Sequence, residues 1–170
     1  ININIYQETE PLGESGALWK IKKDLTENFL FVNGDLIFSV DFSRVINFHK
    51  RLNSDITLVT HTSNHPFDSD LVSSPNGTKI EKIYLKNQKS HYKSHAYLGF
   101  SAIALINKKV IFNVQPPSNI KFSSLFHHLV RESFKMNYKI FSYNTTEYIK
   151  DMGTPSRFNE AQNAIKNNIL

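Results

Sequence analysis

The chain has 170 residues, 40% of them hydrophobic and 21% charged, which fits one globular domain over residues 1–170 with a core of its own. No apolar run is long enough to span a membrane, no secretion signal is recognised at the start, and the absence of cysteine excludes disulfides and thiolate metal sites. The net charge of +5 suits an anionic small molecule. We therefore expect a cytoplasmic domain with no membrane partner.

The first half of the chain is predicted to alternate between strands and helices. Alternating apolar residues predict a strand over residues 1–5, and apolar residues at helical spacing predict a helix from Ser15. The continuous apolar run over residues 29–32 is typical of a central parallel strand that is buried on both faces. A helix over residues 42–52 and a strand over residues 56–60 follow.

In the second half, a loop is predicted over residues 61–74, followed by strands over residues 79–85 and 98–106. A helix over residues 125–134, a strand over residues 138–141 and a final helix from Pro155 complete the chain. Phe158, Ala161 and Ile165 supply the apolar face of the final helix, and His127 and His128 are expected on a helix surface. This order predicts an α/β fold with a Rossmann-like, mostly parallel sheet between two helical layers. Ligands bind such sheets at the carboxyl ends of the strands.

Two aspartates occupy positions of this kind. Asp35 follows the predicted strand directly after Gly34, and Asp151 stands at the turn before Pro155. Two carboxylates that meet from distant parts of the chain would form a hard oxygen site suited to Mg²⁺. The alternative is that Asp35 is a turn residue and Asp151 a helix cap, since aspartate is favoured in both roles. Spacing alone leaves both interpretations open.

Three segments resemble, in the same order, motifs of the sugar-1-phosphate nucleotidylyltransferases. Residues 8–18 (ETEPLGESGAL) resemble E-x-x-P-L-G-T-A-G-A-L, residues 29–35 (FLFVNGD) resemble a strand ending in N-G-D, and residues 148–155 (YIKDMGTP) resemble W-x-D-x-G-T-P. The resemblance covers essentially the whole chain. Residues 60–72 and 147–155 are similar, more narrowly, to the transferase domains of bifunctional heptose-phosphate proteins.

This resemblance implies a GT-A-type transferase that joins a nucleoside triphosphate to a sugar 1-phosphate and releases pyrophosphate. Asp35 and Asp151 match the two carboxylates that hold Mg²⁺ in that family. The family's glycine-rich G-G-x-G-T-R-type phosphate loop has no counterpart in this sequence. The chain is therefore expected to be the C-terminal portion of such a domain, with the N-terminal part missing.

The resemblance also assigns residues to the nucleotide. Pro11 and Gly13 match positions that line the base pocket, and Glu8 stands where the family selects the base. A carboxylate accepts two hydrogen bonds, and guanine offers adjacent donors at N1 and N2, whereas uracil and thymine offer one donor at N3. Glu8 thus favours GTP, and the alternative is a surface glutamate without a role in binding.

Two further residues are assigned to the sugar phosphate. Lys86 matches the catalytic, sugar-phosphate-binding lysine of the family's E-K-P element, and a compact ammonium suits a phosphate. Leu85 and Asn87 replace the glutamate and the proline of that element, so the usual contact to a sugar hydroxyl is in question. Gly99 matches the strand glycine on which the sugar packs. The implied sugar is of heptose or mannose type, and the implied pathway makes a cell-envelope glycan. The resemblance also allows a homo-oligomer or a fused phosphatase domain as a partner.

Three alternatives remain. A degenerate, catalytically weak domain that binds a nucleotide sugar or a partner protein fits the absent loop. A zinc site could draw on the H-x3-H pairs His61/His65 and His91/His95, but catalytic zinc needs a third protein ligand. A nucleic-acid module could use the basic stretch over residues 79–93, yet the modest net charge and the lack of a known motif argue against nucleic acid, and a solvated surface is the simpler interpretation.

Overall fold

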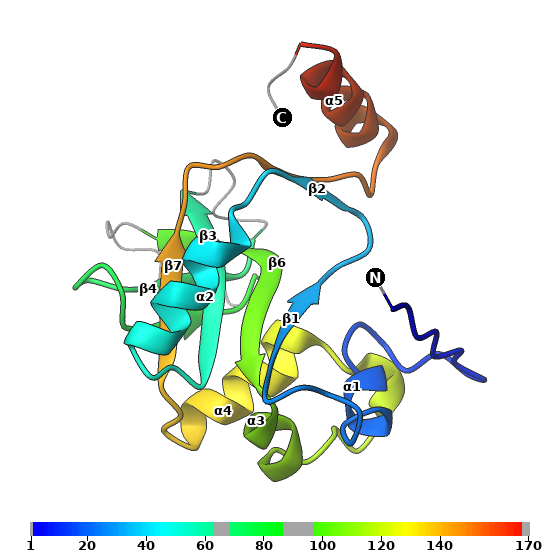
Figure 1. Ribbon diagram of the computed structural model, residues 1–170, viewed down its shortest axis with the longest axis vertical. Helices are drawn as coiled ribbons and strands as arrows, with labels where there is room; N and C mark the ends of the chain where they lie inside the picture. Colours follow the sequence, from blue (N-terminus) through cyan, green and yellow to red (C-terminus); the bar gives the residue numbers. More distant parts are fainter. Residues whose placement is uncertain (1, 63–68, 87–96, 168–170) are drawn as a thin grey trace.

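The computed structural model describes residues 2–62, 69–86 and 97–167. Its strands are β1 (Asn28–Val32), β2 (Leu36–Phe38), β3 (Ile56–Thr62), β4 (Leu71–Ser73), β5 (Lys82–Tyr84), β6 (Tyr97–Asn107), β7 (Ile140–Asn144) and β8 (Ile149–Asp151). Its helices are α1 (Ala17–Lys20), α2 (Phe42–Arg51), α3 (Lys108–Asn113), α4 (Arg131–Lys135) and α5 (Pro155–Lys166), with a 3-10 turn η3 (Ile120–Phe122) and a π-helical turn η4 (Leu125–Val130) that runs directly into α4. Figure 1 shows their arrangement.

Six strands form the main sheet in the order β5-β4-β6-β3-β7, and β1 also pairs with β6. Strands β1, β3, β4 and β7 run in one direction, while β5 and β6 run in the other. The sheet is therefore mixed, with most strands sharing one direction, although β3 and β7 are the one pair of parallel neighbours in the described sheet. This arrangement confirms the Rossmann-like α/β fold expected from the sequence.

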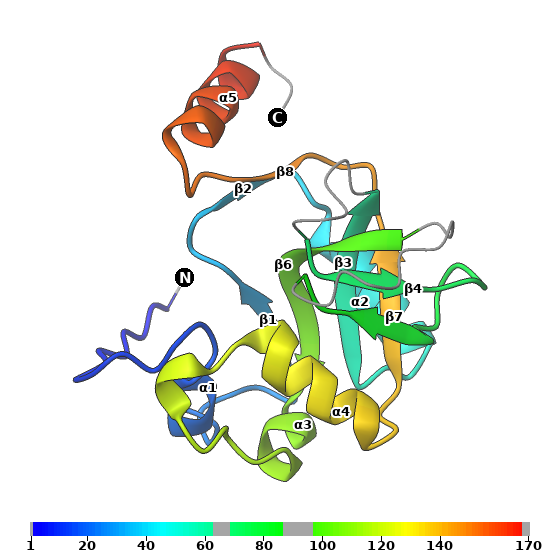
Figure 2. The ribbon, with the colours of Figure 1, turned by 180° about the vertical axis from the view of Figure 1, so that it is seen from behind.

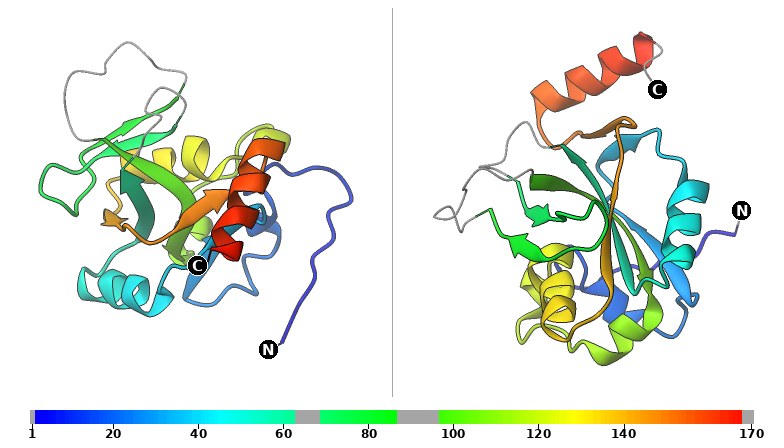
Figure 3. Two further views of the ribbon diagram at one scale, coloured as in Figure 1. Left: turned by 90° about the horizontal axis from the view of Figure 1, so that it is seen from above. Right: turned by 90° about the vertical axis from the view of Figure 1, so that its left-hand side faces the viewer.

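The two faces of the sheet bury separate cores because successive side chains of a strand point to opposite faces. On β3, Ile56 and Leu58 pack into a larger core with Leu129 of η4, whereas Val59 packs into a smaller core with Val45 of α2. Helices cover both faces, and in the right-hand view of Figure 3 α2 (cyan) and α4 (yellow) lie on opposite sides of the strands. The three-layer prediction is confirmed.

A second sheet, formed by β2 and β8, lies beside one end of the main sheet and leads into α5 (Figures 1 and 2). Thr154 caps α5 by accepting a hydrogen bond from the backbone N–H of Arg157, and Pro155 occupies the first turn, as the sequence predicted. The predicted apolar face was wrong in part, because Phe158 and Ile165 are exposed, whereas Ala161 is buried. Among the described residues, no helix is both long and apolar enough to cross a membrane.

One strand prediction at the start of the chain was wrong, and a second was right about the strand but wrong about its place in the sheet. Residues 2–5 form no strand, and Ile3 and Ile5 are 79% and 90% exposed. Strand β1 forms as predicted, but its side chains are half-buried and within the described residues it pairs with β6 alone, in antiparallel register. It is therefore not a central parallel strand. The predicted loop over residues 61–74 contains β4, whose three residues are all buried.

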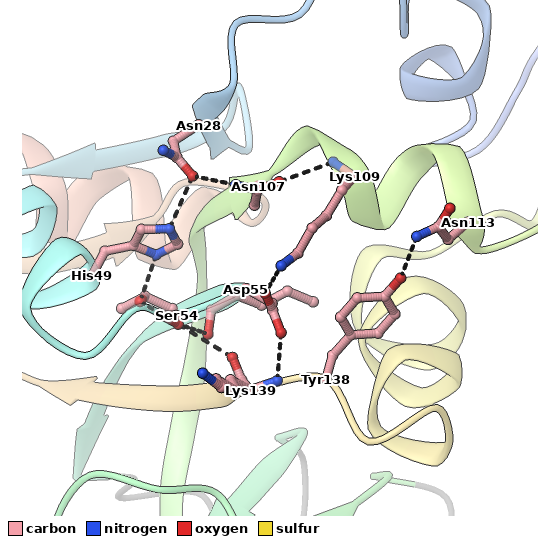
Figure 4. Close-up of polar contacts among 11 residues, drawn as sticks. Asn28, His49, Ser54, Asp55, Asn107, Lys109, Asn113, Tyr138 and Lys139 are labelled. Atoms are coloured by element: carbon pink, nitrogen blue, oxygen red, sulfur yellow. Dashed lines mark hydrogen bonds and ion pairs between the residues drawn. The ribbon is translucent and has the colours of Figure 1, made fainter.

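A polar network connects the strands at the end of the sheet where β3 begins (Figure 4). His49 of α2 is buried, with Nδ1 2.9 Å from Thr57 Oγ1 and Nε2 3.1 Å from Asn28 Oδ1. Nearby, Asp55 accepts a hydrogen bond from the backbone N–H of Lys139 at 2.8 Å and pairs with Lys109. These contacts attach α2, β1 and β7 to the first residues of β3.

The burial of His49 predicts that stability falls in acid. Desolvation lowers the pKa of His49 below its ordinary value of 6.5, against the opposing influence of Asp55. The unfolded chain therefore binds a proton below pH 6.5 that the folded chain resists, so the free energy of unfolding decreases as the pH falls through that range. For one proton the slope is at most about 1.4 kcal/mol per pH unit.

Urea denaturation of the wild type and of His49→Gln at pH 7.5, 6.5 and 5.5 measures this effect. We expect the variant to be less stable at pH 7.5 and the difference between the two proteins to shrink at pH 5.5. A difference that is constant across the series would contradict the assignment, because the other histidines are common to both proteins.

Candidate active site

Asp35 and Asp151 lie on adjacent backbone segments, although 116 positions separate them in the sequence. Strands β2 and β8 pair so that Leu36 stands opposite Asp151, and the backbone N–H of Met152 donates to the carbonyl of Asp35 at 2.8 Å. A β-carbon added to Gly153 would lie 3.5 Å from Asp151 Oδ1 and 3.6 Å from Asp35 Oδ2. The two carboxylates therefore face the same small space beside Gly153.

The turn that carries Asp35 is held by two contacts of Asn33. Its backbone N–H donates to the carbonyl of Ala102 at 3.2 Å, and its side-chain amide donates to Glu14 Oε1 at 3.2 Å. Ala102 has a φ of +59°, which is unfavourable for a residue with a β-carbon, and it lies where the pairing of β3 with β6 changes register. This irregularity in β6 places the Ala102 carbonyl opposite Asn33 beyond the end of β1.

Glu14 connects that turn to a helix. Its Oε2 accepts hydrogen bonds from the Ser124 hydroxyl and from the backbone N–H of Leu125, both at 3.0 Å. These donors lie at the start of η4, where unpaired N–H groups favour a carboxylate. This role could not be predicted from the sequence, because the three partners of Glu14 lie 19, 110 and 111 positions away from it.

Arg157 provides a positive charge beside the aspartate pair. Its Nη1 is 2.8 Å from Asp151 Oδ1, and the two side chains are 42% and 40% exposed. The neighbouring Lys150 pairs with Glu160 of α5. Arg157 was not identified from the sequence, but it occupies the third helical position after the capping Thr154, which brings its side chain back toward Asp151.

A cavity of about 520 Å³ collects most of these groups. Among its lining residues are the acidic and basic ones Glu14, Asp35, Asp70, Lys86, Lys150, Asp151 and Arg157. Three predicted site residues, Asp35, Asp151 and Lys86, thus line one cavity. Lys86 is exposed, and its backbone N–H donates to Asp70 Oδ1 at 3.0 Å.

The other predicted site residues do not line this cavity. Glu8, Pro11 and Gly13 are exposed on the segment before α1, where Glu8 Oε2 accepts a hydrogen bond from the backbone N–H of Leu12 at 3.0 Å. Gly13 has a φ of +72°, and a β-carbon there would lie 2.6 Å from the carbonyl of Ser123. Gly99 is buried in β6, although its neighbour Phe100 lines the cavity.

The histidine predictions have mixed outcomes. His127 is not on a free helix surface, because its Nε2 is 2.8 Å from both carboxylate oxygens of Asp70. His61 lines the cavity, whereas His65, His91 and His95 lie outside the described residues, as do Lys89 and Lys93 of the basic stretch. In the described part of the chain, no three His, Cys, Asp or Glu side chains are placed to hold a metal ion together.

Two protein carboxylates are nevertheless a suitable donor set for one hard cation. Mg²⁺ is usually held by one or two carboxylates, with substrate phosphate and water oxygens as the remaining ligands. Asp35 and Asp151 offer oxygens to one space, from the turn before β2 and from the end of β8, so a shared ligand would bind the two segments together. The residues present therefore fit a magnesium ion that is completed by a bound phosphate.

The chain is similar to several known nucleotidyltransferases. Over 170 residues the chain is 28% identical to D-glycero-alpha-D-manno-heptose 1-phosphate guanylyltransferase of Aneurinibacillus thermoaerophilus, covering 99% of this chain and 70% of that protein. It is 27% identical to glucose-1-phosphate adenylyltransferase of Mycoplasma mobile over 81% of this chain and 37% of that protein.

The fold is also found in a solved structure. The UDP-glucose pyrophosphorylase from Acinetobacter baumannii superposes with a TM-score of 0.73 at 16% identity, covering 90% of this chain and 56% of that one. The chain thus spans only 37% and 56% of two of these three proteins. Residues 1–168 match the nucleotidyl transferase family, and the chain therefore belongs to that family.

Proposed function

We propose that the full-length protein is a sugar-1-phosphate nucleotidylyltransferase, and that Asp35 and Asp151 hold its Mg²⁺ ion. The main support is that both carboxylates face the space beside Gly153, in a cavity that Lys86 also lines. Membership of the nucleotidyl transferase family supports the same reaction class.

The reaction would need no nucleophile from the protein. A phosphate oxygen of the sugar 1-phosphate attacks the α-phosphorus of the nucleoside triphosphate and forms a new P–O bond. The bond to the β-phosphate breaks, and pyrophosphate leaves with the electron pair. Magnesium would neutralise the two phosphates as they approach and help to align them for in-line attack.

The side chains around this centre divide the remaining work. Lys86 offers an ammonium that can bind the sugar phosphate, and a hydrogen bond to Asp70 holds its backbone at the cavity wall. Arg157 orients the Asp151 carboxylate through the 2.8 Å ion pair. Glu14 and Ala102 hold Asn33, and so hold the turn that presents Asp35.

We infer further that GTP is the preferred nucleotide and that the sugar is of heptose or mannose type. Glu8 supports the base, through edge complementarity of its carboxylate with guanine, although one Glu8 oxygen also accepts from the Leu12 N–H. The heptose guanylyltransferase relative supports base and sugar alike. Pro11 and Gly13 would border the base, and Gly99 the sugar. The product would be made in the cytoplasm for a cell-envelope glycan, by a homo-oligomer or by a protein with a fused phosphatase domain.

A grid of substrates tests this proposal. Purified full-length protein is incubated with Mg²⁺, each of GTP, ATP, UTP, CTP and dTTP, and each of mannose, glucose and D-glycero-D-manno-heptose 1-phosphates. We expect the fastest pyrophosphate release with GTP and with the heptose or mannose substrate. A preference for UTP or dTTP would contradict the role of Glu8. Binding of a nucleotide sugar without turnover in any combination would support the degenerate, binding-only alternative.

A further inference from the structure

Asp70 is held in one orientation at the wall of the cavity. Both of its carboxylate oxygens lie 2.8 Å from His127 Nε2, and Oδ1 also accepts from the backbone N–H of Lys86 at 3.0 Å. Its side chain is 19% exposed, and that of His127 is 33% exposed. A carboxylate with this many partners loses little further conformational entropy when it binds a ligand.

The two residues occupy different places relative to the cavity. Asp70 is among the residues that line it, whereas His127 of η4 contacts Asp70 and is not among them. Each carboxylate oxygen has two acceptor sites, and among the described contacts Oδ2 uses one of them, toward His127. Asp70 therefore keeps acceptor capacity for a donor inside the cavity.

The chemistry of that donor follows from charge. Phosphate oxygens are acceptors and anionic, so a carboxylate repels them, and Asp70 would weaken the binding of a phosphate that it touched. Sugar hydroxyls donate hydrogen bonds to a carboxylate and carry no charge. The half-buried Phe100 lines the same cavity and offers an apolar ring to the carbon face of a sugar, and the buried Phe126 supports that ring, with the two centroids 5.3 Å apart.

We propose that Asp70 binds a hydroxyl group of the sugar and that His127 is the positioning residue that orients it. This inference depends on the proposed function, because it assigns the sugar end of that same cavity. Asp70 would also supply the contact to a sugar hydroxyl that the family's glutamate makes and that Leu85 cannot make. The Asp70 carboxylate accepts a hydrogen bond from the backbone of Lys86. Asp70 could therefore bind a hydroxyl of the sugar while the Lys86 ammonium binds the phosphate of the same substrate.

The first experiment compares Asp70→Asn with Asp24→Asn in the full-length protein. Asp24 is an exposed aspartate that does not line the cavity, so its variant is the matched control. A hydrogen bond to a charged acceptor supports a loss of about tenfold to a hundredfold in sugar 1-phosphate affinity for Asp70→Asn. We expect KM for the nucleotide to stay within about twofold, since the change removes one interaction at the sugar end. Equal KM values for the sugar phosphate in both variants would overturn the inference.

A second experiment separates recognition from a structural effect. The wild type, Asp70→Asn, His127→Gln and His127→Leu are each titrated calorimetrically with mannose 1-phosphate and its monodeoxy analogues. One deoxy analogue, which lacks the hydroxyl that Asp70 binds, should bind the wild type more weakly than mannose 1-phosphate does. Asp70→Asn should bind that analogue and mannose 1-phosphate equally well. His127→Gln, which keeps a donor, should retain more affinity than His127→Leu. If, for every analogue, the loss of affinity from Asp70→Asn and the loss from the missing hydroxyl simply add, Asp70 contacts no hydroxyl.

Failure of this inference can be told apart from failure of the proposed function. Calorimetric binding requires no turnover, so a protein that binds mannose 1-phosphate through Asp70 without releasing pyrophosphate would retain the inference and lose the reaction. Normal pyrophosphate release with unchanged sugar affinity in Asp70→Asn would retain the reaction and overturn the inference. Wild-type protein that binds no sugar 1-phosphate would overturn both.

Discussion

Replacing Asp35 or Asp151 by alanine in the full-length protein is expected to lower the rate of pyrophosphate release by at least about a thousandfold, because each change removes one of the two carboxylates of the proposed magnesium site. The fold should tolerate both changes. Asp35 is exposed, and Asp151 is half-exposed with one ion pair, which contributes about 0–1 kcal/mol at most. Initial rates over a range of Mg²⁺ concentrations, with urea denaturation of the same samples, measure the two effects separately.

Arg157→Ala is the control for the ion pair. It breaks the contact with Asp151 but leaves both carboxylates, so its loss of activity should be much smaller than that of Asp151→Ala. Equal losses in these two variants would show that the pair with Arg157 matters, rather than metal binding. Unchanged turnover in both aspartate variants would refute the magnesium assignment altogether.

The elements that could be predicted from the sequence are those with local signals. Pro155 marks the start of α5, and the β-branched run in β3 is buried as a core strand should be. The α2 helix begins and ends within one residue of its prediction. In each case the deciding contacts are made within the segment or follow from its own apolar pattern.

The predictions that failed depend on distant residues. Alternation at Ile3 and Ile5 fits a strand, but a strand also needs a neighbour to pair with, and sequence alternation cannot supply one. For β1 the apolar run was interpreted correctly as a strand, whereas its position in the sheet depends on its register with β6. Pairing between segments is a property of the folded chain rather than of either segment.

The candidate site shows the same division. Asp35 and Asp151 could be identified because each stands in a recognisable motif, and the structure adds that they face one space. Asp70 lies in residues 60–72, but the resemblance of that segment assigned it no role, and His127 comes to it from 57 positions away. Residues 61–74 were predicted as a loop, in which an aspartate is not a specific signal. Side-chain pairs of this kind become visible when the strands and helices are placed.

The second large effect is expected at Gly16, where alanine should lower the free energy of unfolding by about 3 kcal/mol. Gly16 precedes α1, and a β-carbon there would lie 2.0 Å from the carbonyl oxygen of Leu12 and 2.8 Å from its β-carbon. Leu12 is 4% exposed, so neither its backbone nor its side chain can move aside easily. The clash must be relieved by displacing the segment before α1.

That displacement would reach the active site, because the same segment is attached to η4 and to the turn of Asp35. Ser15 Oγ lies 2.8 Å from Ser123 Oγ, and Glu14 joins Asn33 to the first N–H groups of η4. We therefore expect Gly16→Ala to reduce nucleotide affinity and kcat together. A protein that lost stability but kept both kinetic parameters would show that the segment does not contribute to nucleotide binding.

Gly34→Ala is the matched control, since a β-carbon at Gly34 would have no atom within 4 Å. Its free energy of unfolding should change by less than about 1 kcal/mol, the usual range for alanine in an open position. If a ligand approaches the backbone before Asp35, as a glycine there permits, this variant should lose substrate affinity while keeping its stability. The two glycines thus separate two physical roles. Gly16 leaves room for the protein's own backbone, and Gly34 would leave room for the substrate, so Gly16→Ala should lower both the urea midpoint and the substrate affinity, whereas Gly34→Ala should lower the substrate affinity alone.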